Sequence, residues 1–182
     1  MKATGITRKI DELGRIVIPK EIRRTLRIRE GTPLEIFTEN NGEIILRKYS
    51  PMGELVAFAA QYADSLAQAA GMMVCITDLE QVIAAAGGAK KEYLGKAISE
   101  KLDQQIEERM ASQASADERK YIPIIKEAVS EKTAQTICPI ICQGDVIGSV
   151  ILLAKDARIK MGETEKKLAY CAAGFFGRQM EE

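Results

Sequence analysis

Residues 8–26 of the chain read RKIDELGRIVIPKEIRRTL, and this stretch decides the fold of the N-terminal part. The segments on either side of residues 11–14 predict two strands, residues 5–10 and 15–18, joined by a hairpin turn that ends in Gly14. Pro19 can open a helix, because its missing N–H costs nothing at the first helical position. The stretch therefore predicts two strands followed by a two-turn helix over residues 20–26.

A second hairpin follows this helix. Residues 34–37 alternate with period two, and residues 40–42, Asn-Asn-Gly, carry a strong hairpin signal before a return strand over residues 43–48. A ββαββ unit of about fifty residues buries too little surface to be stable alone. The unit has no disulfide or metal ligand to stabilise it, so the remaining way to stabilise it is oligomerisation. We therefore expect residues 1–50 to form an obligate dimer.

Positive charge is concentrated at the N-terminal end. The whole chain has 26 Lys/Arg and 26 Asp/Glu, but residues 1–50 hold 11 basic against 7 acidic residues, and residues 51–182 hold 15 against 19. On a wheel of 100° per residue, four cations share an arc of about 100° on the side away from Ile22 and Leu26; they are Lys20, Arg23, Arg24 and Arg27. Like charges at i,i+4 cost stability, which indicates an external anion as their counter-charge.

The first hairpin carries more cations, namely Lys2, Arg8, Lys9 and Arg15. A single basic helix face is most often a solvated surface. Two basic clusters on one small unit instead favour DNA, and the arginine fork suits both phosphates and guanine edges. A dimer would present these clusters to a DNA target with two-fold symmetry.

The N-terminal residues resemble a known family. Residues 1–6, 8–19 and 21–26 are similar to the AbrB-type swapped-hairpin transcription regulator family. The resemblance implies that two chains interleave their hairpins into one β-barrel. It also implies that Arg8, Arg15, Arg23 and Arg24 contact DNA, with Lys9 and Lys20 as weaker candidates.

The rest of the chain predicts a second domain over residues 54–182, after a linker at 51–53. The apolar spacing indicates helices and strands in the order helix-β-β-helix-β-β-helix. The expected helices are 54–70, 92–111 and 162–180, the expected strands are 72–78, 82–86, 133–142 and 146–154, and 112–132 stays unassigned. This α+β layout is typical of GAF-like sensor domains. Such a domain either holds a small ligand or serves only for dimerisation, and the sequence nominates no ligand residues.

The resemblance continues into this domain. Residues 49–51, 54–55, 161–163, 172–175 and 178–181 are similar to sporulation regulators that couple the swapped-hairpin domain to a GAF-like domain. This implies activation and repression of forespore genes in an endospore-forming bacterium. It also implies that helices 54–70 and 163–180 join dimers into a tetramer. The alternatives are a transition-state-type regulator or an antitoxin-like interaction protein.

Several functional classes are disfavoured by composition. The chain has no histidine, which excludes histidine-based catalysis and histidine metal ligands. The four cysteines, Cys75, Cys138, Cys142 and Cys171, form no C-x-x-C pair and are expected to be buried, reduced thiols. We therefore predict no enzyme activity, no metal and no cofactor. No apolar run is long enough to span a membrane and no signal peptide is evident, so we expect a cytoplasmic protein.

Overall fold

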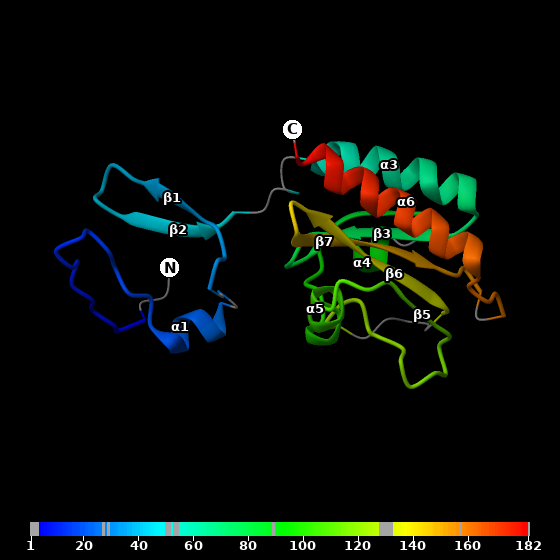
Figure 1. Cartoon of the computed structure of the whole chain (residues 1–182), viewed down its shortest axis with the longest axis horizontal. Helices are drawn as coiled ribbons and strands as arrows, with labels where there is room; N and C mark the ends of the chain where they lie inside the picture. The colour runs from blue at the N-terminus through cyan, green and yellow to red at the C-terminus, as the bar shows by residue number, and fades with distance from the viewer. Residues whose placement is uncertain are drawn as a thin grey trace. The chain divides into compact units, whose positions relative to one another are not determined.

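The computed structural model describes residues 4–26, 28, 30–49, 52, 55–88, 90–127, 133–156 and 158–181. The chain divides into two compact units, Met1–Tyr49 and Ser50–Glu182 (Figure 1). Among the described residues, no helix is long and apolar enough to cross a membrane. Met52, which falls in the predicted linker, is fully buried in the core of the second unit. Pro51 and Gly53, the other linker residues, lie outside the described residues.

The first unit contains helix α1 (Lys20–Thr25) and an antiparallel hairpin of β1 (Leu34–Thr38) and β2 (Ile44–Lys48). Ile36 lies opposite Leu46 in this hairpin. Its turn is closed by a hydrogen bond from the Gly42 N–H to the Glu39 carbonyl, with Gly42 at a φ of 83°. The sequence placed both strands and the turn correctly, because each depends on local chemistry.

The predicted strands 5–10 and 15–18 differ from the structure, which assigns no strand among the described residues 4–19. They form two arms joined by a turn, in which the Asp11 N–H bonds the Arg15 carbonyl and the Gly14 N–H bonds the Asp11 carbonyl, both at 3.0 Å. A strand needs a hydrogen-bonded neighbour along its length. The described part of the single chain supplies none here, and Ile10 and Val17 remain 63% and 71% exposed.

The second unit is built on a five-stranded antiparallel sheet in the order β4-β3-β7-β6-β5. Its strands are β3 (Met73–Thr77), β4 (Val82–Ala86), β5 (Ser112–Ala114), β6 (Gln135–Cys142) and β7 (Asp145–Leu153). Four of them fall where the sequence predicted strands. The fifth, β5, comes from the segment that the sequence left unassigned, since three residues are too few to show a period.

Helices cover both faces of this sheet (Figure 1). Helices α3 (Val56–Ala70) and α6 (Glu163–Gln179) enclose one apolar core with it. Helices α4 (Lys90–Tyr93) and α5 (Glu100–Glu107) lie on the other side, over a second core. The single helix predicted over 92–111 is therefore wrong. Gly95 adopts a φ of 74°, and Ser99 caps α5 by accepting a 3.0 Å bond from the Leu102 N–H, so the chain forms two helices.

Aromatic side chains join α3 to α6. Tyr62 stacks on Phe175 with ring centroids 5.4 Å apart, and Phe58 meets Phe176 edge-on at 5.8 Å. Phe176 is fully buried. The two helices therefore pack against each other within one chain.

Candidate nucleic-acid interface

Helix α1 carries three of the predicted contact residues. Lys20, Arg23 and Arg24 are all exposed on it. The Arg23 Nε donates a 3.2 Å hydrogen bond to the Ile18 carbonyl, which ties this guanidinium to the start of the helix. Arg27, a fourth cation in the sequence pattern, lies outside the described residues. Three cations are thus displayed along one short helix, as the wheel predicted.

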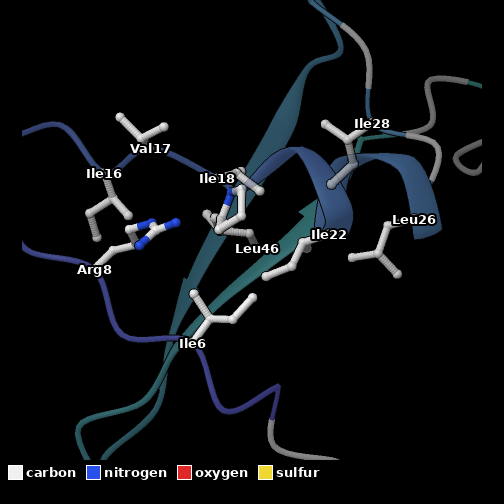
Figure 2. A pocket seen from close by; sticks show the side chains of 10 residues that line it. Ile6, Arg8, Ile16, Val17, Ile18, Ile22, Leu26, Ile28 and Leu46 are labelled. Atoms are coloured by element: carbon white, nitrogen blue, oxygen red, sulfur yellow. The ribbon is translucent and has the colours of Figure 1, made fainter.

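The apolar side of α1 is less covered than the wheel suggested. Ile22 is half-buried, but Leu26 remains 54% exposed. Both border an apolar hollow of about 340 Å³. Figure 2 shows the Ile22 and Leu26 side chains together with the other side chains that line this hollow. Ten residues line it: Ile6, Arg8, Ile16, Val17, Ile18, Pro19, Ile22, Leu26, Ile28 and Leu46. Such a lining suits an apolar protein surface better than a polar small molecule.

The other three predicted residues lie on the two arms. Arg8 and Lys9 belong to the first arm, and both are exposed. Arg8 also lines the apolar hollow, where its guanidinium lies among aliphatic side chains (Figure 2). Arg15 follows the turn and is likewise exposed. Lys2, named with them in the sequence pattern, lies outside the described residues.

Arg15 differs from the other five candidates because it has a carboxylate partner. Its Nε lies 2.9 Å from the Asp11 Oδ2, whereas the described part of the chain offers no carboxylate partner to the other five. Hydrogen bonds from the Arg15 backbone N–H and then from its guanidinium hold the pKa of Asp11 below its usual value. The Asp11 carboxylate is therefore charged at neutral pH and bound to Arg15.

Two features of this unit escaped the sequence reading. The sequence pattern predicts Asp11 only as part of a turn, although an aspartate at the first position of a turn often accepts hydrogen bonds from the backbone with its side chain. Arg47 lies with its Cζ 4.6 Å from the centroid of the Phe37 ring, a cation–π contact. No local pattern marks it, because the pairing of β1 with β2 brings these two residues together.

The four cysteines of the second unit are free thiols, and only two of them are buried. Cys75 and Cys138 are buried, whereas Cys142 is half-buried and Cys171 is exposed. The prediction of four buried thiols is therefore wrong for the last two, which lie at the end of β6 and on the outside of α6. Burial raises the pKa of Cys75 and raises that of Cys138 to about 11, so neither forms a reactive thiolate at neutral pH.

One buried polar side chain stands out in the second unit. Gln135 is 1% exposed, and among the described residues neither its Oε1 nor its Nε2 has a hydrogen-bond partner. It lies opposite Leu153, a member of the core beneath α4 and α5, so its amide faces that core. Within the described residues, no group of three or more acidic or cysteine side chains could hold a metal ion.

Comparison with known proteins gives matches to both units. The family model described as stage V sporulation protein T C-terminal, transcription factor, matches residues 54–181. The model described as antidote-toxin recognition MazE, bacterial antitoxin, matches residues 7–54.

Two relatives from Bacillus subtilis (strain 168) were found by sequence. Stage V sporulation protein T is 50% identical over 182 residues, which span 100% of both chains. Transition state regulatory protein AbrB is 46% identical over 84 residues, or 46% of this chain and 86% of that protein.

Among solved structures, the cofactor binding GAF domain of the nutrient sensor CodY from Clostridium difficile matches with a TM-score of 0.52 at 14% identity, covering 71% of this chain and 92% of that one. At this identity the likeness concerns the fold alone. The predicted fold class, an AbrB-like first domain followed by a GAF-like α+β domain, is confirmed by these matches.

Proposed function

Because this chain belongs to the stage V sporulation protein T family of transcription factors, we propose that it regulates forespore genes by binding double-stranded DNA through its first unit. The observation that carries the proposal is the display of Lys20, Arg23 and Arg24 on α1, together with the cations of the two arms. Arg8, Arg15, Arg23 and Arg24 are the principal contacts, and Lys9 and Lys20 support them. Regulation would include both activation and repression.

The bound form of the first unit would be a dimer. Within its described part, Pro19 is the only aliphatic or aromatic residue that is buried, although the unit is rich in isoleucine and leucine. Exposed apolar surface on this scale requires a partner. A second copy supplies one, because its arms can pair with these arms and fill the hollow next to α1. The result would be the swapped-hairpin barrel of the family.

The second unit would join two dimers into a tetramer through the outer faces of α3 and α6. Val56 and Tyr170 are 42% and 51% exposed there. Deleting residues 163–182 is a poor test, because Phe176 on α6 is fully buried in the core. Tyr170→Glu is better, since it changes only the outer face. We expect this variant to sediment as a dimer with an unchanged melting temperature, and a persisting tetramer would count against this interface.

A sensory role for the second unit is supported by Gln135. A buried amide with no partner for donor or acceptor is costly, and a small molecule with a complementary donor–acceptor edge would relieve that cost. Membership of a family of transcription factors favours binding over catalysis, and so do the raised pKa values of the Cys75 and Cys138 thiols.

Because the proposed target is chromosomal DNA, the proposed location of the protein is the cytoplasm.

An antitoxin-like role is the second candidate, because the antitoxin model matches residues 7–54. Selection of bound fragments from random DNA by the full chain distinguishes the two. We expect an enriched sequence and an affinity that falls by about a thousandfold or more between 50 and 200 mM salt, for about 6–8 neutralised phosphates. Weak binding with a flat salt response and no enriched sequence would overturn the regulator proposal.

A further inference from the structure

The Asp11 carboxylate divides its two oxygens between two tasks. Oδ1 accepts hydrogen bonds from the backbone N–H groups of Leu13 and Arg15, at 3.0 and 2.7 Å. Oδ2 accepts the 2.9 Å bond from the Arg15 Nε. Oδ1 therefore stabilises the backbone of the turn, while Oδ2 holds the guanidinium of Arg15, the residue that follows the turn.

This arrangement leaves the far edge of the Arg15 guanidinium open. The described residues supply no acceptor to its two terminal amino groups, because only Nε is engaged by Asp11. Those two groups can donate a parallel pair of hydrogen bonds to the O6 and N7 atoms of a guanine. A long side chain that is already oriented loses less rotational freedom when it binds.

We propose that Asp11 is a positioning residue that gives Arg15 its base selectivity, an inference that rests on the proposed contact of Arg15 with DNA. The carboxylate acts in two ways. It aims the open edge of the guanidinium, and its negative charge opposes simple attraction to phosphates. Asp11 thereby lowers affinity for arbitrary DNA while raising affinity for the correct sequence.

The same turn offers a matched control. Glu12 is exposed, and within the described residues its carboxylate makes no hydrogen bond or ion pair. Asp11→Asn and Glu12→Gln therefore remove one negative charge from neighbouring positions. If charge were the whole role of Asp11, both variants would bind every DNA more tightly and to the same extent.

The experiment measures the affinity of full-length protein for a fragment enriched by selection and for a random-sequence duplex. Asp11→Asn keeps an Oδ1 acceptor for the turn, but its amide N–H₂ cannot accept from Arg15 Nε. An exposed ion pair is worth up to about fivefold per chain, and a dimer contains two. We expect the ratio of selected to random affinity to fall by about three- to thirtyfold in Asp11→Asn and to stay within about twofold of the parent in Glu12→Gln.

Arg15→Ala and the double variant Asp11→Asn/Arg15→Ala separate the possible failures. We expect Arg15→Ala to weaken selected binding, and Asp11→Asn to lower the ratio no further once Arg15 is absent. If Asp11→Asn behaves like Glu12→Gln while Arg15→Ala weakens binding, the positioning role is overturned and the proposed function stands. If Arg15→Ala changes nothing, the assigned contact of Arg15 fails and the positioning role fails with it.

Discussion

Replacing Ile36 with alanine is expected to weaken dimerisation of the first unit by about 3 kcal/mol. Ile36 lies on β1 and is 66% exposed in the single chain. Alanine removes three carbons, each contributing about 0.8 kcal/mol when buried. About two-thirds of that surface is left for a partner to cover, which amounts to about 1.6 kcal/mol per chain. Two copies per dimer then raise the Kd by about two hundredfold.

A fragment of residues 1–50 is suited to this measurement, because it separates the first unit from any association of the second. We expect its melting temperature to rise with concentration, as it must when folding and dimerisation are coupled. Sedimentation and circular dichroism over a dilution series then give the Kd. The Ile36→Ala fragment should dissociate at about two hundredfold higher concentration than the parent.

Glu35→Ala is the control, since Glu35 is the exposed neighbour of Ile36 on the same strand and offers a partner far less apolar surface. We expect it to change the Kd by no more than about twofold, as for ordinary surface sites. A melting temperature independent of dilution, together with a single-chain mass, would refute the coupling. Equal effects of the two variants would refute the apolar contact of Ile36.

Three other predictions concern the remaining parts of the chain. Arg23→Ala and Arg24→Ala should each change the free energy of unfolding by no more than about 0.5 kcal/mol but weaken DNA binding by about 1–3 kcal/mol. Lysine at either position should keep a contact with phosphate but not a paired contact with a base. If both alanine variants bind DNA as tightly as the parent, the exposed side of α1 is only a solvated surface. In the Tyr170→Glu variant, where the outer face of α6 is not covered by a second dimer, alkylation at neutral pH should modify the exposed Cys171 and spare Cys75, whose pKa is raised by burial. Mass spectrometry of peptides checks this, and rapid labelling of Cys75 would contradict it. Gln135→Leu should raise the unfolding free energy of ligand-free protein by about 1 kcal/mol or more, since it removes a buried amide that has no partner within the described residues. A lower unfolding free energy, measured by denaturant titration, would mean that the amide is hydrogen-bonded in solution.

Turn chemistry explains why much of the first unit could be predicted from the sequence. Gly14 and Gly42 both adopt positive φ at the ends of their turns, where glycine carries little steric cost. The absence of strand structure in the described residues of the two arms could not be predicted in the same way. Their residues have the composition of strands, but strand pairing needs a second surface that one chain does not supply.

The sequence by itself determined the display of cations on α1, because positions along a helix follow from its 3.6-residue period alone. It also determined four of the five strands of the second unit and the two helices, α3 and α6, that begin and end it. Only the tertiary structure decided that Met52 is buried in a core and that the Arg47 guanidinium lies over the Phe37 ring. It also decided that the Gln135 amide is buried with no hydrogen-bond partner in the described part of the chain. These outcomes depend on residues that are distant in the chain, and no local period or turn signal encodes which of them will meet when the strands pair and the helices pack.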